Sequence, residues 1–361
     1  MNRFTRPYAL LGGAVSAIAL TAAMTVPAQA SAATGWNVAF QDQYGAASNY
    51  SDYFSVVAPS NDNIWAFGTT NAAEAGLPAA EHYTGGQWQP VTLPSGLGDS
   101  VLYAASASSA DNIWAVSENG LYALEWNGSQ WSVAHTWQDT GAQITGVTAL
   151  SPTNVWVWGA GGYTGGIGTW HFNGTTWTEV GGAAAGIDTA SAVSASNIWA
   201  IGSDGDNPQD AIVHYSNRSW HPVSSPALDN AMFNGVLAVS KTDVWVAGEA
   251  SSAKTSPVLT QFNGTAWASV TVPWKVQLDR IASDGAGGLW FTANPAKSPG
   301  TTWLLHRSAS GKWTKTVIDP AGSSVFGLSL VAGTTSVVGA GNVATTQGSA
   351  AAVYLHGTLG S

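Results

Sequence analysis

The chain of 361 residues contains no cysteine, which excludes disulfide bridges, thiolate metal sites and lipid attachment through a cysteine. Charged residues are also scarce: Asp, Glu, Lys and Arg make up 9% of the sequence, against about 25% in average proteins. Beyond the N-terminal stretch, no segment has the 3.6-residue hydrophobic period of an amphipathic helix. We therefore expect an all-β protein that is stabilised by packing rather than by covalent cross-links.

Basic residues are fewer than acidic ones, with 11 Lys and Arg against 21 Asp and Glu. Residues 1–30 hold two of the basic residues and no acidic one, so the rest of the chain has 9 minus 21, or a net charge of −12. Nucleic acid and anionic membranes are poor partners for such a protein. Polar uncharged and aromatic groups must cover its surface, a composition compatible with contacts to glycans.

The N-terminal stretch has the features of a secretory signal peptide. Arg3 and Arg6 precede an apolar run at 9–26, and small residues follow it. Cleavage after Ala30 or after Ala32 fits equally well. A membrane anchor is the alternative, disfavoured because the run is short and its residues are small. We expect a signal peptide at 1–30, a single domain at 31–361, and a secreted, extracellular protein without membrane insertion.

A repeated pair of tryptophan motifs dominates the rest of the chain. The first motif, Ser-x-x-Asn/Asp-Ile/Val-Trp, recurs at intervals of 42 to 49 residues and gives one column: Trp65, Trp114, Trp156, Trp199, Trp245 and Trp290. The second motif places a tryptophan directly after a short turn and gives another column: Trp36, Trp88, Trp131, Trp177, Trp220, Trp267 and Trp313. A seventh copy of the first motif is degenerate, and the alignment puts Ser336 in the tryptophan place.

Each repeat contains four short runs of β-branched, aromatic and small apolar residues, separated by turn residues. Four strands at a period near 45 residues are the pattern of a β-propeller. The last repeat supplies three strands and stops at Gly357, whereas residues 35–40 match a fourth strand and have no partner strands before them. We therefore predict a seven-bladed β-propeller with four-stranded antiparallel blades, closed by an N-terminal strand that completes the last blade.

Polar residues that recur once per repeat are interpreted as structural. Four histidines share one place near the end of the third strand, where two other repeats have Glu125 and Gln261: His82, His171, His214 and His306. A catalytic or metal site would not be distributed once per blade, so we expect these histidines to make hydrogen bonds within the repeat.

Two segments resemble known propeller repeats. The turn Asn173-Gly174-Thr175-Thr176-Trp177 is similar to the tail of an Asp-box, which also lies between the third and fourth strands of a blade, although the aspartate of that motif is absent. Residues 282–292 resemble one repeat of the virginiamycin B lyase type. Over residues 36–357 the chain resembles secreted bacterial seven-bladed propellers. The resemblance implies a ligand site at the mouth of the central channel, on the face with the variable loops.

Alignment of the innermost strands predicts a ring of side chains near that mouth: Phe54, Tyr103, Thr145, Asp188, Asn234, Asp279 and Val325. Function normally lies on variable loops carried by a rigid scaffold. Neighbouring Trp274 and Arg280 are added to give the candidate ligand-binding set: Tyr103, Asp188, Asn234, Trp274, Asp279 and Arg280. Aromatic faces stack on sugar rings, and carboxylates and amides bond hydroxyls. We expect a neutral or cationic, carbohydrate-like ligand; the alternative is that Trp274 merely caps a blade edge.

An enzyme is the second hypothesis. A glycoside hydrolase needs two opposed carboxylates, and Asp188 with Asp279 could supply them, or a lyase could use them with Arg280. The alternative for the same residues is that they line the channel and bond trapped water. We favour a binding module for an extracellular glycan, a wall component or a protein, because no nucleophile, base or metal constellation stands out.

One acidic loop is a candidate calcium site. Asp204, Asp206 and Asp210 lie close together around a glycine turn, and calcium takes several oxygen ligands of this kind. Pro208 interrupts the alternation of ligands that calcium loops usually have. No other cofactor is predicted, and we expect a monomer.

Overall fold

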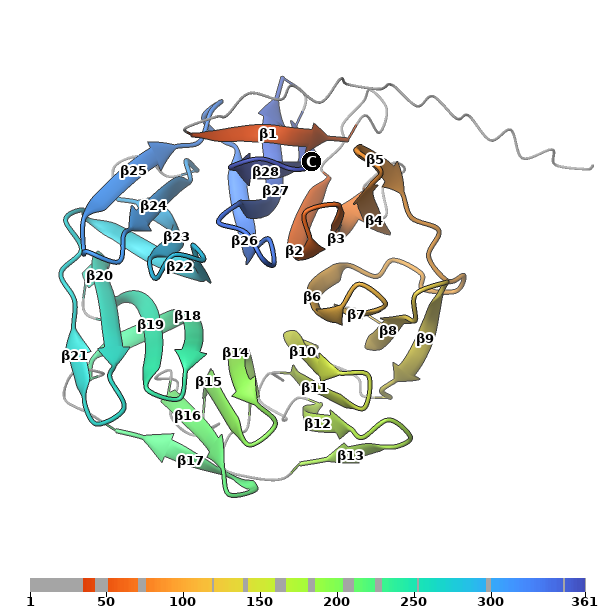
Figure 1. Cartoon of the computed structure of the whole chain (residues 1–361), viewed down its shortest axis with the longest axis horizontal. Coiled ribbons are helices and arrows are strands. Elements are labelled where there is room, and N and C mark those ends of the chain that lie inside the picture. The colour runs from red at the N-terminus through yellow and green to blue at the C-terminus, as the bar shows by residue number, and fades with distance from the viewer. Residues whose placement is uncertain are drawn as a thin grey trace, which may run out of the picture.

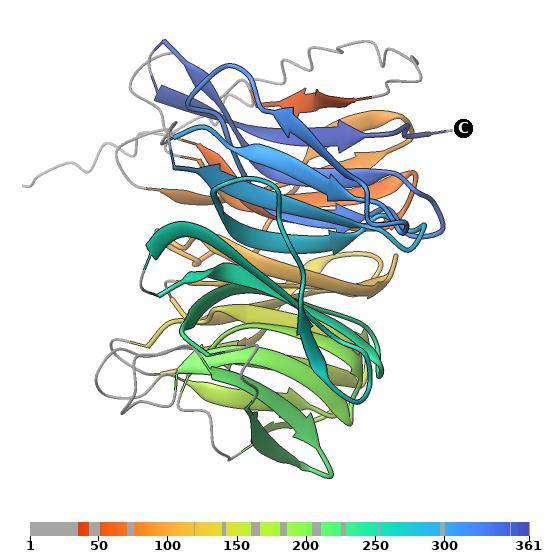
Figure 2. The ribbon, with the colours of Figure 1, turned by 90° about the vertical axis from the view of Figure 1, so that its left-hand side faces the viewer.

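The computed structural model of the protein describes residues 35–42, 51–70, 76–118, 120–138, 142–159, 167–180, 186–203, 211–224, 229–251, 253–296, 300–346 and 348–360. Its strands form seven four-stranded antiparallel sheets. Figure 1 shows these sheets as blades around a central opening, and Figure 2 shows their strands running from one face of the ring to the other. The predicted seven-bladed β-propeller is thus confirmed.

The first three blades follow one another along the chain. Blade 1 contains β2 (Asp52–Ser60), β3 (Asn63–Thr70), β4 (Leu77–Thr84) and β5 (Gln87–Pro90). Blade 2 contains β6 (Leu102–Ser109), β7 (Asn112–Ser117), β8 (Tyr122–Trp126) and β9 (Trp131–Thr136). Blade 3 contains β10 (Gly146–Ser151), β11 (Asn154–Gly159), β12 (Gly168–Phe172) and β13 (Trp177–Glu179).

The next three blades repeat the same order, with the first strand innermost. Blade 4 contains β14 (Gly186–Ser194), β15 (Asn197–Ser203), β16 (Ala211–Ser216) and β17 (Ser219–Val223). Blade 5 contains β18 (Ala231–Ser240), β19 (Asp243–Ala250), β20 (Ala253–Phe262) and β21 (Trp267–Ser269). Blade 6 contains β22 (Val276–Ser283), β23 (Leu289–Pro295), β24 (Trp303–Arg307) and β25 (Trp313–Val317).

Blade 7 joins the two ends of the chain. Its inner strands are β26 (Ser324–Leu330), β27 (Val337–Thr345) and β28 (Gly348–His356), and its outer strand is the N-terminal β1 (Trp36–Gln41). The Trp36 ring meets the Trp290 ring of blade 6 edge-on at 5.2 Å, and Phe40 stacks on Trp88 of blade 1 at 5.3 Å. The N-terminal strand therefore completes the last blade, as predicted, and it also contacts both neighbouring blades.

Seven clusters of buried apolar side chains hold the ring together, one at each junction between blades. At the junction of blades 4 and 5, Trp199 and Ile201 pack with Val236 and Val246. A buried tryptophan removes about 200 Å² from water, which stabilises the fold by at most about 5 kcal/mol at 25 cal/mol per Å². The repeated tryptophans thus explain how a chain without disulfides holds a large ring closed.

Blade 7 corrects one detail of the repeat alignment. Gly341 pairs with Val325 as Gly68 pairs with Tyr53, and a Cβ at either glycine would lie 1.9 Å from a carbonyl oxygen of the inner strand. The residue three places before this glycine is a tryptophan in blade 1 and Val338 in blade 7. The prediction that Ser336 takes the tryptophan place was therefore wrong by two residues.

Three of the four repeat histidines make the predicted hydrogen bond within the repeat, whereas His214 Nε2 has no hydrogen-bond partner among the described residues. His82 stacks on Trp65 with 3.7 Å between ring centroids, and the ring nitrogens of both residues bond to Asn63 Oδ1. Blade 3 repeats this arrangement at Asn154, which bonds both Trp156 and His171 at 3.0 Å. His306 pairs with Asp284 at 2.8 Å, and His214 stacks on Trp199 at 4.1 Å.

The predicted signal peptide at 1–30 lies outside the described residues. Within the part of the chain that the structure covers, no helix is long and apolar enough to cross a membrane.

Candidate functional site

Bulges in the innermost strands build a ring of side chains at the channel. The pairing of the first two strands skips one residue in five blades, and the skipped residues are Phe54, Tyr103, Asp188, Asn234 and Phe326. In blade 6 the skip includes both Asp279 and Arg280. In blade 3, Thr145 lies directly before the inner strand β10, and its backbone N–H donates to the carbonyl of Trp158 in β11 at 3.0 Å. The fold thus repeats a bulge in six blades, and each of these blades presents a side chain that need not fit the strand ladder.

The structure corrects one member of the predicted ring. Val325 is 4% exposed and packs in the cluster between blades 6 and 7, whereas the next residue, Phe326, occupies the bulge. Fifteen residues separate Val325 from Gly341, but fourteen separate Tyr53 from Gly68. The longer first turn of blade 7 therefore shifted the sequence alignment by one residue. Five of the other six predicted positions lie in these bulges, and Thr145 directly precedes the inner strand of blade 3.

Three consecutive blades make one side of the ring aromatic. The Phe54 ring lies 5.4 Å from Phe326 and 5.8 Å from Tyr103, with tilted planes at both contacts. These residues belong to blades 7, 1 and 2 and are all half-buried. Their contacts form a continuous apolar arc, which offers ring faces to a ligand.

The other four blades make the opposite side polar. Thr145 Oγ1 donates to the carbonyl of Ile187 in blade 4, and Asn234 Nδ2 donates to the carbonyl of Leu278 in blade 6 at 2.9 Å. Asp188 is exposed and has no hydrogen-bond partner among the described residues. Polar side chains therefore link neighbouring blades, while the Asp188 carboxylate remains free to bond a ligand.

Two carboxylates of this side have perturbed pKa values. Burial raises the pKa of Asp279 to about 6; Arg280 and the Asn294 hydrogen bond lower it, and Glu249 raises it further. Glu249 lies at the end of β19 and is 5% exposed. The protein around Asp188 raises the pKa of that carboxyl too, although water reaches it. The acidic side chains at the ring therefore lie on blades 4 to 6.

Arg280 crosses the ring to the aromatic side. Its Nε donates to the carbonyl of Phe326 at 3.1 Å, and its Nη2 donates to the hydroxyl of Tyr103 at 3.5 Å. Arg280 belongs to blade 6 and Tyr103 to blade 2, so blades 7 and 1 lie between them in the ring (Figure 1). The guanidinium thus spans the ring and narrows the channel at this level.

Trp274 does not join the ring. It packs with Trp313 at 6.2 Å, edge to face, and the Lys315 ammonium lies 6.0 Å from its ring. Both contacts are with β25, the outermost strand of blade 6. The structure therefore brings together five of the six predicted binding residues and places the sixth at the outer edge of blade 6, where it caps the blade.

The predicted calcium ligands Asp204, Asp206 and Asp210 lie outside the described residues. Among the residues that the structure does describe, no group of three or more His, Asp or Glu side chains could hold a metal ion.

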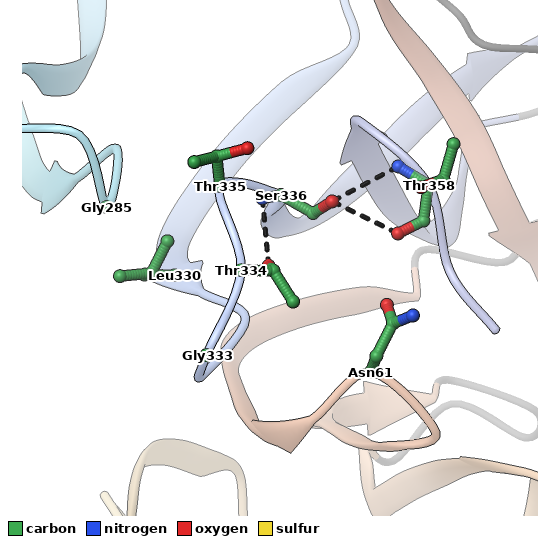
Figure 3. Close-up of a pocket in the computed structure, with 8 residues that line it drawn as sticks. All are labelled: Asn61, Gly285, Leu330, Gly333, Thr334, Thr335, Ser336 and Thr358. Carbon is green, nitrogen blue, oxygen red and sulfur yellow. Dashed lines mark hydrogen bonds between the residues drawn. The ribbon is translucent and has the colours of Figure 1, made fainter. Parts of the chain in front are cut away.

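A second hollow lies at the opposite end of the blades, where first turns from blades 1, 6 and 7 meet the C-terminal residues (Figure 3). It has a volume of about 650 Å³, and sequence reasoning missed it. Two of its hydroxyls already have partners: Ser336 Oγ donates to the carbonyl of Thr358 at 3.0 Å, and Thr334 Oγ1 to that of Val331 at 2.9 Å. No titratable side chain lines it, so the channel ring has the richer binding chemistry.

Sequence reasoning also missed Glu249 and Asn294, the partners that set the environment of Asp279. Both lie near the ends of second strands, and the repeat motifs end before them. Their approach to the ring depends on how far each second strand continues, which no motif encodes.

Solved structures with the same architecture are similar to this chain over most of its length. YCF48 bound to D1 peptide is 13% identical, with a TM-score of 0.62 over 90% of this chain and 97% of that chain. A catalytically inactive virginiamycin B lyase from Staphylococcus aureus, solved with quinupristin, is 10% identical, with a TM-score of 0.62 over 84% and 94%. The WD40 repeats of RRP9 are 8% identical, with a TM-score of 0.60 over 89% and 97%.

No family model and no curated protein matches the sequence. The similarity to solved structures therefore extends to the fold, and this chain is a seven-bladed β-propeller distantly similar to YCF48 and to virginiamycin B lyase.

Proposed function

We propose that the protein is a secreted binding module that holds a neutral or cationic, carbohydrate-like ligand at the channel ring. The observation that carries this proposal is the division of the ring into an aromatic arc, Phe326, Phe54 and Tyr103, and a polar, acidic side around Asp188 and Asp279. Small-ligand sites combine apolar faces with a few polar groups that fix orientation.

The two sides of the ring have complementary tasks in this proposal. The aromatic arc stacks on the apolar face of a sugar ring, while the Asp188 carboxylate and the Asn234 carbonyl oxygen accept hydrogen bonds from hydroxyls or an amine. Neither acceptor has a partner among the described residues. Arg280 crosses the ring, so the ligand rests in the mouth and does not thread the channel.

The charge of the ring selects against anions. Asp188, Asp279 and Glu249 carry three carboxyl groups, and Arg280 is the one ring residue with a permanent positive charge. A cationic ligand would favour the ionised form of Asp279, whose pKa of about 6 makes its charge pH-dependent. Binding of a cationic ligand should therefore strengthen as the pH rises through 6.

The N-terminal stretch supports the extracellular part of the proposal, since two arginines and an apolar run precede small residues at the expected cleavage position. The absence of cysteine is compatible with any compartment. Release of a product shortened at Ala30 or Ala32 into the culture medium would test this part.

Peptide is the second candidate ligand. YCF48, which shares the fold, has been solved with a bound peptide. A lysine or arginine side chain would suit the same ring, because its aliphatic stem packs on aromatic faces while its charged end reaches carboxylates. A peptide library with basic residues is therefore the natural second probe.

Catalysis at the ring remains the alternative function, and its candidate groups are Asp188 and Asp279. The virginiamycin B lyase structure is of a histidine-to-alanine form described as catalytically inactive. In this chain, the rings of six of the seven histidines contact tryptophan rings, and the remaining His221 bonds to the carbonyl of Ser216. The histidine positions thus give no support to a base of that kind at the ring, and binding is the better-supported function.

A glycan array probed at pH 7 with the mature protein tests the proposal. We expect binding to neutral or amine-bearing glycans. This binding should fall at least about tenfold in Asp188→Asn, which removes a carboxylate from the polar side, and in Tyr103→Ala, which removes a ring from the aromatic arc. Lys241→Gln, an exposed charge change on the β18–β19 turn, is the matched control and should bind as the wild type does. Retention of full binding by both ring variants, with unchanged melting temperatures, would contradict the proposal.

A further inference from the structure

Positive charge is distributed very unevenly along this chain. Of the 11 Lys and Arg, Arg3 and Arg6 lie in the N-terminal stretch, which leaves nine. Residues 31–217 contain none of these nine, although they contain 15 of the 21 acidic residues. Six of the nine fall between residues 275 and 315, the segment that contains the strands of blade 6: Lys275, Arg280, Lys297, Arg307, Lys312 and Lys315. Blade 6 is therefore a local basic region on an acidic protein.

One of these positive charges lies against aromatic rings at the outer edge of the blade. The Lys315 ammonium lies 3.9 Å from the centre of the Trp303 ring and 6.0 Å from that of Trp274. Trp274 in turn packs edge-on against Trp313. We name Lys275, Lys312, Lys315, Trp274, Trp303 and Trp313 the blade 6 patch.

The ammonium groups of the patch are free to bind an external anion. Lys275, Lys312 and Lys315 are exposed, and none of them pairs with a carboxylate in the described part of the chain, where the ion pair is His306 with Asp284. The cation–π contact holds Lys315 in place without neutralising its charge. β25 is the outermost strand of its sheet, so no further strand of the blade covers it.

We propose that the blade 6 patch binds an acidic polysaccharide, independently of the channel ring. Lysines bond the anionic groups along such a polymer, and the partly exposed tryptophans pack against its sugar rings. Charges that are farther away than the Debye length, about 8 Å at physiological salt, are screened. A thin, flexible polymer can therefore use one blade edge while the acidic blades repel a broad anionic surface such as a membrane.

The two sites have opposite selectivity. The ring presents carboxylates and excludes anions, whereas the blade 6 patch presents unpaired ammonium groups. A single module could therefore hold a neutral or cationic ligand in its mouth while its edge is attached to an anionic matrix.

Affinity electrophoresis of the full-length mature protein in gels that contain polygalacturonate tests the patch, with dextran sulfate as a second anion and neutral dextran as the blank. We expect retardation by one or both anionic polymers, decreasing with added salt, and none by dextran. Lys315→Gln should weaken binding about two- to fivefold, the effect of one exposed ion pair. The double variant Lys275→Gln, Lys315→Gln should bind the polymer more weakly still. Lys315→Arg keeps the positive charge and should bind the polymer as the wild type does.

Two controls separate the patch from the rest of the molecule. Lys241→Gln removes one lysine from blade 5, and Asp188→Asn changes the ring; both should bind the anionic polymer as the wild type does. Unchanged retardation in the double variant would overturn the proposal, as would equal retardation by dextran. Tighter binding to duplex DNA or to anionic lipid vesicles than to either polysaccharide would overturn the assigned ligand class. Preference for polygalacturonate or for dextran sulfate would identify carboxylate or sulfate as the recognised group.

Discussion

Arg280 in blade 6 donates a hydrogen bond to the hydroxyl of Tyr103 in blade 2, at 3.5 Å and 177 residues apart in the chain. The same guanidinium bonds to the carbonyl of Phe326 in blade 7. One side chain thus connects three blades around the channel. Arginine suits this position because its planar group donates several hydrogen bonds in fixed directions.

Removal of this connection should cost stability. Arg280→Met keeps much of the side-chain volume but removes both hydrogen bonds, and we expect the free energy of unfolding to fall by about 1–3 kcal/mol, as for hydrogen bonds of a charged group. Urea denaturation followed by tryptophan fluorescence measures it. Tyr103→Phe removes only the longer bond and should have a smaller effect. Equal stability of Arg280→Met and wild type would show that the connection is not formed in solution.

The closing strand should be indispensable despite its terminal position. Deletion of residues 34–40 removes β1 and with it the contacts of Trp36 and Phe40 to two neighbouring blades. We expect a sharply lower melting temperature in differential scanning calorimetry. Val38→Ala, at a residue of the same strand that is 41% exposed, should melt almost as the wild type does. A deletion variant that melts unchanged would mean that the ring does not depend on β1.

The repeat separates a tryptophan that carries stability from a histidine that adds little. Trp199 is 4% exposed and contacts Phe262 and Trp267 of blade 5. Trp199→Ala should therefore cost about 3–5 kcal/mol, the usual range for a buried aromatic truncation. His214→Ala should cost less, because His214 Nε2 has no hydrogen-bond partner among the described residues. Loss of ligand binding in a folded His214→Ala protein would contradict the structural role of the histidine column.

Acid should destabilise the protein through its histidines. Burial lowers the pKa of His82 to about 4, although Asp62 opposes the shift. The unfolded chain therefore binds a proton before the folded one does, so this contribution to stability is lost as the pH falls from about 6.5 to 4. The unfolding free energy of His82→Gln relative to that of the wild type should therefore be highest at pH 4. Unfolding free energies at pH 4, 5, 6 and 7 test this, and a pH-independent difference would refute it.

Asp42 should contribute a pH dependence of stability with the opposite sign. Burial raises the pKa of Asp42 to about 6, so the folded state holds its proton more tightly than the unfolded chain, and stability is lost as the pH rises from about 4 to 6. Its Oδ1 accepts from Ser51 at 3.2 Å, while Oδ2 is buried without a partner among the described residues. Asp42→Asn should therefore gain stability relative to wild type at pH 7 and not at pH 4. The opposite order would rule out this carboxyl as a titrating group.

Most of the fold could be predicted from the sequence because the repeat has strong physical markers. The tryptophan columns mark the second and fourth strands, and a glycine at the end of the second strand is needed where the inner strand passes too close for a Cβ. Closure followed from a missing strand at one end and an extra strand at the other. Blade 7 was misaligned because it lacks the tryptophan and has a longer first turn, so Ser336 and Val325 were placed wrongly.

The candidate site could be predicted less completely. Strand alignment placed five ring residues in bulges, because the bulges repeat with the strands, and it placed Thr145 next to the inner strand of blade 3. The contacts of Arg280 with Tyr103 and of Asp279 with Asn294 depend on side-chain reach across the ring, which spacing does not encode. Trp274 was misplaced for a similar reason: it lies on an irregular link, where no period fixes its direction.

Isothermal titration of the glycan that binds best on the array would show whether the channel ring is the ligand site. The wild type, Asp188→Asn and Lys315→Gln would be titrated at pH 7 under identical conditions. We expect Asp188→Asn to lose at least about tenfold in affinity, because it removes the unpaired carboxylate of the ring, and Lys315→Gln to bind as tightly as the wild type. Equal affinity of Asp188→Asn and wild type, or a loss confined to Lys315→Gln, would contradict this expectation.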